Sequence, residues 1–178
     1  MRWQTGEGGA FTASFEAALA ARPGDKALWL SLLRTLAQSR RWDTLATQVR
    51  AARQAAGDDP LFDMGAAIAA SESGAEATQA FEQIAPVLGG ERHFALAWAR
   101  HLLRARDPVR AAAVVEPWAG TGAASDQLAW ALLGTAWRMT GDARHDWLID
   151  TATMTRALDI DSVGMPLASA WWAIRPTV

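Results

Sequence analysis

The chain has 178 residues, a length that fits one domain, and 51% of them are hydrophobic, which is ample for a buried core. The formal net charge of −2 argues against a general nucleic-acid binder, because such proteins usually carry a basic excess. The absence of cysteine excludes disulfides and thiolate metal ligands.

The residue types favour an all-α protein. Alanine dominates and tyrosine is absent, and alanine, leucine, arginine and glutamate lose little rotamer freedom on a helix. The N-terminus lacks the apolar core of a signal peptide, and the longest apolar stretches are shorter than the ~20 residues that cross a bilayer. Arginine outnumbers lysine sixteen to one, as a GC-rich genome would produce. We therefore expect a soluble, cytoplasmic, bacterial protein with no membrane partner.

Residues 1–10 are expected to form a flexible N-terminus, and residues 11–150 a helical-repeat domain. Within that domain the first apolar stripe, Phe11, Phe15 and Ala18, predicts a helix that ends at the break over residues 22–25. This helix has the character of the second half of a helix pair, so it predicts a half unit before the first full repeat.

Four longer stripes follow, and each has apolar or small residues at offsets of three, four and seven, which lie on one helical face. They begin 32, 34 and 35 residues apart and consist of Trp29, Leu32, Leu33 and Leu36; Leu61, Met64, Gly65 and Ile68; Ala95, Trp98, Ala99 and Leu102; and Trp130, Leu133, Gly134 and Trp137. The first three are each followed by a shorter stripe: Leu45, Val49 and Ala52; Ala77, Phe81 and Ile84; and Ala111, Val115 and Trp118. Breaks at residues 57–60, 89–90 and 120–122 fall where such helix pairs should end.

These residues carry a family resemblance. The pattern Trp130-x-x-Leu133-Gly134-x-x-Trp137, followed by Thr140-Gly141-Asp142, resembles the first helix and turn of a tetratricopeptide repeat. The pattern Ala77-x-x-x-Phe81-x-x-Ile84 resembles its second helix, and a period of ~34 residues is that of the family. The resemblance implies a right-handed α-solenoid of antiparallel helix pairs with about 3.5–4 repeats, because a single pair cannot bury its apolar face.

In proteins of this family the first helices line a concave groove that binds the ligand. The helical wheel predicts the groove residues here as those turned away from the stripes: Leu30, Arg34, Gln38, Phe62, Leu96, Arg100, Arg104, Arg138 and Met139. The guanidinium fork of arginine suits carboxylates, so we expect a peptide or protein partner that is acidic or presents its C-terminus. The alternative is a solvated helix face in an arginine-rich protein.

No catalytic residues, cofactor or metal site are expected. His93 and His101 are eight residues apart, which is ~12 Å along a helix and too far for joint metal ligation. His145 and Asp146 are adjacent, and neighbouring residues of a helix do not face the same way. The sequence therefore predicts a non-enzymatic interaction module.

Residues 141–150 resemble the junction at which some bacterial proteins join tetratricopeptide repeats to an iron- and 2-oxoglutarate-dependent oxygenase domain. This resemblance implies an alternative function, the N-terminal region of a truncated oxygenase, inactive because the His-x-Asp pair of that fold is absent. An RNA-binding helical repeat is a third hypothesis, disfavoured by the sequence pI of about 5.9.

Residues 151–178 are interpreted as a junction and capping tail. The apolar segment at residues 169–174 is expected to form a final helix over the last repeat, since the ends of a solenoid need covering. If the tail does not fold back, its tryptophans are a candidate surface for homo-oligomer formation.

Overall fold

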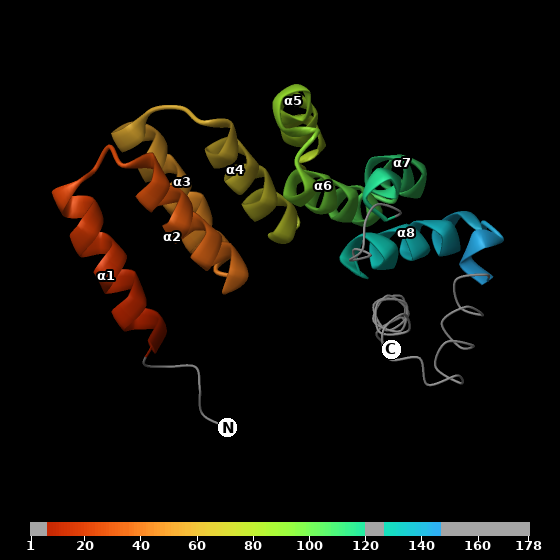
Figure 1. The fold of residues 1–178 in the computed structure, drawn as a ribbon, viewed down its shortest axis with the longest axis horizontal. Coiled ribbons are helices and arrows are strands. Elements are labelled where there is room, and N and C mark those ends of the chain that lie inside the picture. The colour runs from red at the N-terminus through yellow and green to blue at the C-terminus, as the bar shows by residue number, and fades with distance from the viewer. Residues whose placement is uncertain (1–6, 120–126, 147–178) are drawn as a thin grey trace. The chain divides into compact units, whose positions relative to one another are not determined.

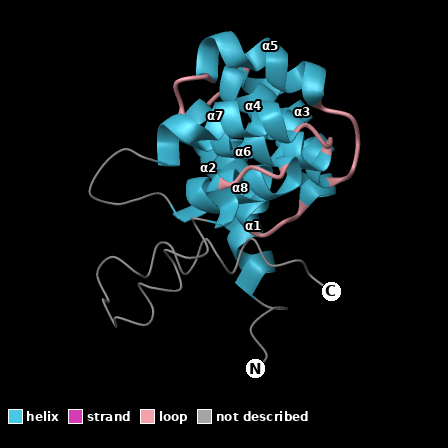
Figure 2. Cartoon of the chain, turned by 90° about the vertical axis from the view of Figure 1, so that its right-hand side faces the viewer, coloured by secondary structure: helices cyan, strands magenta, loops and turns pink. Residues whose placement is uncertain are grey.

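The computed structural model describes residues 7–119 and 127–146, and every regular element in these ranges is an α-helix (Figure 1, Figure 2). The prediction of an all-α protein is confirmed for this part of the chain. The helices are α1 (Glu7–Ala21), α2 (Lys26–Gln38), α3 (Trp42–Ala56), α4 (Pro60–Glu72), α5 (Thr78–Leu88), α6 (Arg92–Arg104), α7 (Pro108–Ala119) and α8 (Gln127–Thr140).

The described residues divide into two compact units, with the boundary between Leu88 and Gly89. The helical-repeat domain over residues 11–150 stays a prediction. Helix α1 begins at Glu7, inside the segment expected to be flexible. The predicted breaks at residues 22–25 and 89–90 fall between helices, and the break at residues 57–60 spans the connection after α3 and the first residue of α4. The break at residues 120–122, the end of the junction at residues 147–150 and the capping tail at residues 151–178 lie outside the described residues.

In the first unit each helix packs against the next one along the chain, from α1 to α5, and α2 also contacts α4. Short connections make such neighbours antiparallel. The core between α1, α2, α3 and α4 is formed by one cluster of buried side chains: Leu19, Trp29, Leu32, Leu33, Leu36, Leu45, Val49, Ala52, Phe62 and Ala69. The whole predicted stripe of α2 therefore lies in this core.

In the second unit α6 packs against α7, α7 against α8, and α6 against α8. Their shared core is formed by Leu96, Ala99, Leu102, Ala111, Val115, Ala119, Ala129, Leu132, Leu133, Ala136 and Trp137. The Trp130 and Trp137 rings meet edge to face, with their centroids 6.2 Å apart. Trp137 thus lies in the shared core of these helices, and the partly buried Trp130 packs against it.

The first helix of every pair ends in the same turn. A residue with positive φ follows each of α2, α4, α6 and α8: Arg40, Gly74, Arg106 and Gly141. The next residue donates its N–H to a carbonyl five residues back, as Arg41 does to Leu36 and Asp142 to Trp137. This is the Schellman ending of a helix, which satisfies carbonyls that the helix leaves without partners.

These turns give the structural register of the repeats. Each positive-φ residue lies fourteen positions after the first residue of its helix, and the four helices begin 34, 32 and 35 residues apart. A residue of α2 is therefore equivalent to the residue of α4 that lies 34 positions later.

The register predicted for α4 was wrong by two residues. The predicted stripe began at Leu61, but the residue equivalent to Trp29 is Asp63. Leu61 is 42% exposed, whereas the neighbouring Phe62 is fully buried. The prediction failed because α4 is rich in small residues, so several faces of the helix have nearly the same apolar pattern.

Candidate binding surfaces

In the first unit the predicted groove residues of α2 lie at the edge of the core and outside it. Arg34 and Gln38 are exposed and lie one turn apart on the helix. Leu30 is half-buried and packs against the core cluster. Helix α2 therefore presents two polar side chains, whereas Leu30 is partly covered by the core.

In the second unit the arginines lie on two helices that pack together. Arg100 and Arg104 are exposed one turn apart on α6, and Arg138 is exposed near the end of α8. Met139 is half-buried beside Arg138. The unit therefore carries three exposed arginine residues on adjoining helices.

Two of the predicted groove residues are not on the surface. Phe62 is fully buried and Leu96 is 6% exposed, and each belongs to the core of its unit. Phe62 is buried because the true register of α4 turns it toward α2 and α3. Leu96 is buried because α6 is covered by both α7 and α8, so its buried arc is wider than a single stripe.

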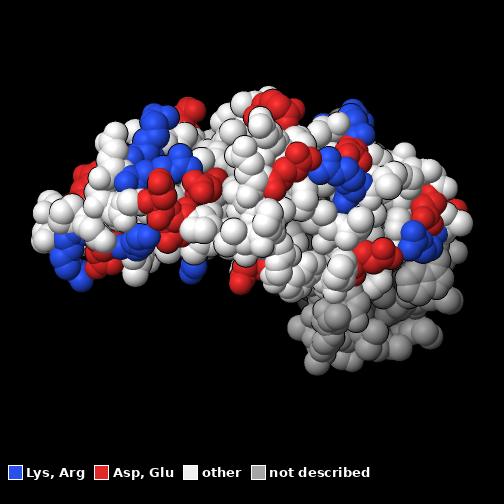
Figure 3. All heavy atoms as spheres, turned by 90° about the horizontal axis from the view of Figure 1, so that it is seen from above, with Lys and Arg blue, Asp and Glu red and all other residues white. Residues whose placement is uncertain are grey.

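Figure 3 shows how charge is distributed on one face of the molecule. Basic and acidic groups alternate over short distances there, and neither sign forms a broad field. On this face, charge therefore occurs in small local groups of both signs.

A shallow hollow of about 440 Å³ lies at the turn between α2 and α3, and no sequence pattern indicated it. The exposed Arg40 and Arg41 line it together with the half-buried Trp42. The hollow also includes Ser73, which caps the end of α4. Sequence reasoning missed it because the hollow combines residues of two turns that are 34 positions apart.

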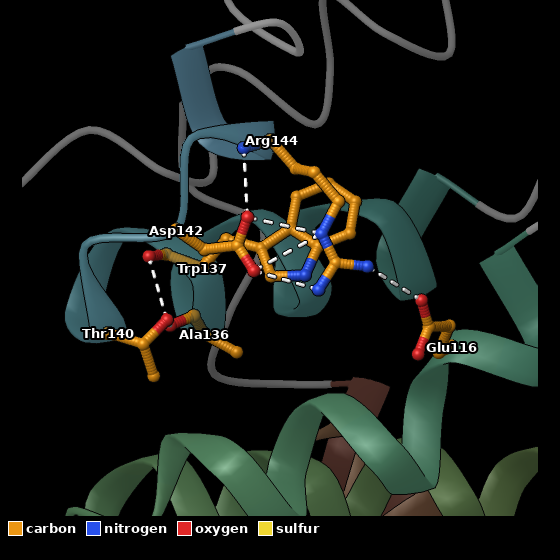
Figure 4. A network of polar contacts seen from close by, with 6 residues as sticks. All are labelled: Glu116, Ala136, Trp137, Thr140, Asp142 and Arg144. Atoms are coloured by element: carbon orange, nitrogen blue, oxygen red, sulfur yellow. Dashed lines mark hydrogen bonds and ion pairs between the residues drawn. The ribbon is translucent and has the colours of Figure 1, made fainter.

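The residues after α8 are held by a network around Arg144 (Figure 4). The Arg144 side chain donates to both carboxylate oxygens of Asp142, at 2.7–3.1 Å, and its Nη1 lies 3.0 Å from Oε1 of Glu116 on α7. The guanidinium also stacks over the Trp137 ring, 4.6 Å from its centroid. Arg144 thus fastens the turn after α8 to α7 and to the core of the second unit.

The electrostatics of this network follow from its hydrogen bonds. The pKa of the Asp142 carboxyl is held below its ordinary value, first because the Arg144 side chain donates to it and then because the Arg144 N–H does, at 2.9 Å. The pKa of Arg144 is raised in turn, chiefly by the hydrogen bonds to Asp142. The start of the segment that resembles an oxygenase junction therefore has a structural role within this chain.

The histidines lie in different surroundings. His93 is exposed, His101 is 4% exposed in the core of the second unit, and His145 is half-buried with its Nδ1 3.5 Å from the Asp146 carboxylate. Within residues 7–119 and 127–146, no group of three or more histidine, aspartate or glutamate side chains is placed to hold a metal ion.

None of the described helices is long and apolar enough to cross a membrane.

No family model, no curated protein and no solved structure matches this chain. The resemblance to tetratricopeptide repeats and to an oxygenase junction therefore stays a prediction from the sequence.

Proposed function

We propose that this chain is a non-catalytic helical-repeat module that binds an acidic segment of another protein. The proposal includes a solenoid of tetratricopeptide type and rests on one observation, the exposed arginine pair on α6. Arg100 and Arg104 lie one turn apart, and Arg138 extends from the adjoining α8. Arginines at this spacing suit carboxylates one turn apart on a partner, because the planar guanidinium group is shaped to donate hydrogen bonds to carboxylate oxygens.

The repeated turns show which arginines occupy equivalent positions. Four first helices share one length from start to turn, and Arg34 of α2 is equivalent to Arg100 of α6. Arg34 of α2 is equivalent to Ile68 of α4, while Arg100 of α6 is equivalent to Thr135 of α8. The arginines are therefore not a feature of every repeat, and the second unit carries the larger group of them.

The test is a fluorescence-anisotropy titration of the full chain with a labelled peptide rich in aspartate and glutamate. The same peptide with asparagine and glutamine in their place serves as the neutral probe. We expect binding of the acidic peptide only. We also expect affinity to fall as salt is raised from 0.1 to 1 M, since the Debye length shortens from ~10 to ~3 Å.

Variants locate the binding surface. Arg100→Ala and Arg104→Ala should each weaken binding by about tenfold, because hydrogen bonds to charged groups contribute roughly 1.5–3 kcal/mol. Arg50→Ala is the matched control, since Arg50 is exposed on the second helix α3. Equal affinities for both peptides, or equal losses in all three variants, would rule the proposal out.

The alternative function, the N-terminal region of an oxygenase, has its own assay. Turnover of 2-oxoglutarate by the purified chain with added iron(II) would support an enzyme in place of a binding module. We expect no turnover.

A further inference from the structure

Helix α4 lacks the large side chains that fill the equivalent positions of α2. The shared register makes Asp63 equivalent to Trp29, and Ala66 equivalent to Leu32. Trp29 and Leu32 are 7% and 2% exposed and belong to the core of the first unit. Helix α8 has tryptophan and leucine at the same two positions, Trp130 and Leu133.

A hollow of about 250 Å³ lies where these side chains are missing. Asp63 and Ala66 line it from α4, and Arg53 lines it from α3, where it forms an ion pair with Asp63. The remaining walls come from the start of α4 and from α5: Pro60, Ala80, Gln83, Ile84 and Val87. Val87 is 66% exposed, so the hollow opens beside an apolar side chain on the surface.

The size and lining of the hollow suit one aromatic side chain. Pockets for drug-sized ligands have volumes of ~300–1,000 Å³, so this smaller space fits a single large residue. Its walls are mostly aliphatic, while the Asp63 carboxylate supplies an acceptor at the edge. In α2 the indole N–H of Trp29 donates to the carbonyl of Pro23 at 2.8 Å, so an indole at this position has an acceptor, as buried indoles usually do.

We propose that this hollow between α3, α4 and α5 binds an indole side chain supplied by the partner protein. The inference rests on the proposed function, since a partner must supply the tryptophan. It concerns helices and residues other than the arginines of α6 and α8. Buried aromatic anchors commonly provide much of the affinity at protein interfaces, so a tryptophan seated here would add to contacts that the arginines make.

The first experiment uses N-acetyltryptophanamide as the probe. It is titrated into the full chain carrying ¹³C-labelled methyl groups, with N-acetylglycinamide as the control compound. We expect saturable shifts of the Ile84 and Val87 methyl signals with a dissociation constant on the order of 1 mM, the range of a small fragment. Shifts no larger than those caused by N-acetylglycinamide would overturn the proposal.

Two variants test the position of the site. Ala66→Leu installs the side chain that α2 and α8 carry, so it should abolish the shifts at Ile84 and raise the melting temperature by filling the space. Val87→Asp should weaken binding at least fivefold without altering the core, because Val87 is exposed. Val109→Asp on α7 is the matched control, since Val109 is 69% exposed and distant in sequence from the hollow.

The outcomes separate this inference from the proposed function. If Ala66→Leu does not fold, Val87→Asp compared with Val109→Asp decides the result. Probe binding that is unchanged in Val87→Asp would overturn the site. Arg100→Ala should leave binding of N-acetyltryptophanamide unchanged, and an acidic peptide that binds when the tryptophan probe does not would overturn this inference alone.

Discussion

Two of the four repeat turns place an arginine where the other two have glycine. Arg40 and Arg106 have φ of 55° and 61°, and Gly74 and Gly141 occupy the equivalent positions with φ of 79° and 71°. The left-handed region brings the Cβ of an L-residue close to the following carbonyl, which costs about 1–2 kcal/mol, whereas glycine has no Cβ. The two arginines therefore hold a strained backbone in these turns.

We predict that Arg40→Gly raises the free energy of unfolding by about 1 kcal/mol, because relief of this strain exceeds the entropy that glycine loses on folding. Urea denaturation followed by tryptophan fluorescence measures the change. The matched control is Arg41→Gly, since Arg41 has φ of −90° and gains nothing from glycine. A stability increase of equal size in both variants would contradict the assignment.

The Arg144 network makes a second prediction at the scale of one residue. Removing the side chain in Arg144→Ala should raise the pKa of Asp142 back toward its ordinary value, because the largest cause of the lowered pKa is lost. An NMR titration of the Asp142 carboxyl carbon measures this. Arg144→Lys should give an intermediate pKa, since an ammonium group cannot donate two parallel hydrogen bonds.

The sign of the linked stability follows from the direction of the shift. A carboxyl whose pKa is lowered in the folded state stabilises that state above its unfolded pKa of ~3.9. The contribution is lost as the pH falls through the folded pKa. The wild type and Arg144→Ala should therefore differ in stability near neutral pH and converge in strong acid, and a difference that grows toward acid pH would contradict this account.

At the scale of the helix, the starts of α2 and α4 are capped and the start of α6 is not. Asp25 accepts a hydrogen bond from the N–H of Leu28 at 3.1 Å, and Asp59 accepts one from Leu61 at 3.0 Å. Glu91 occupies the same place before α6 without a side-chain hydrogen bond to the helix. Asp25 and Asp59 therefore each accept a hydrogen bond from an N–H in the first turn of their helix, whereas the Glu91 side chain accepts none from α6.

We predict that Asp25→Ala lowers the free energy of unfolding by about 1 kcal/mol, the usual loss on removing a capping side chain. The Asp25→Ala variant also loses the ion pair between Asp25 and Arg22, at 3.1 Å, but such surface pairs contribute little to stability. Glu91→Ala is the control, and it should change stability by less than about 0.5 kcal/mol. Losses of equal size in the two variants, measured in urea, would show that the cap of α2 is not stabilising.

Helix existence and helix ends were well predicted because they depend on neighbouring residues. The stripes of α2 and α3 and the breaks at residues 22–25 and 57–60 all match the structure. The register of α4 was not predicted, since it depends on which face meets α2 and α3. Close packing is visible at Gly65, where a Cβ would lie 3.2 Å from Cγ2 of Val49.

The sequence predicted the exposure of some groove residues correctly and of others wrongly. Arg34, Arg100, Arg104 and Arg138 are exposed as expected, because charged side chains avoid burial wherever the backbone allows it. Phe62 and Leu96 were misplaced, because an apolar residue beside a stripe is buried or exposed according to how many helices cover it. The hollow beside Val87 and the Arg144 network bring together residues of different helices, so no local pattern could have indicated them.

At the scale of the whole molecule, the amino-acid sequence was sufficient to predict the helical class of the described residues and most helix boundaries. These properties follow from propensity, periodicity and turn residues, which act within about one turn of helix. The tertiary structure alone decided the division into two units, the face that α4 buries and the hollow left by Asp63 and Ala66. Burial and cavities are set by contacts between helices that are distant in sequence, and an alanine-rich helix fits such contacts in more than one orientation.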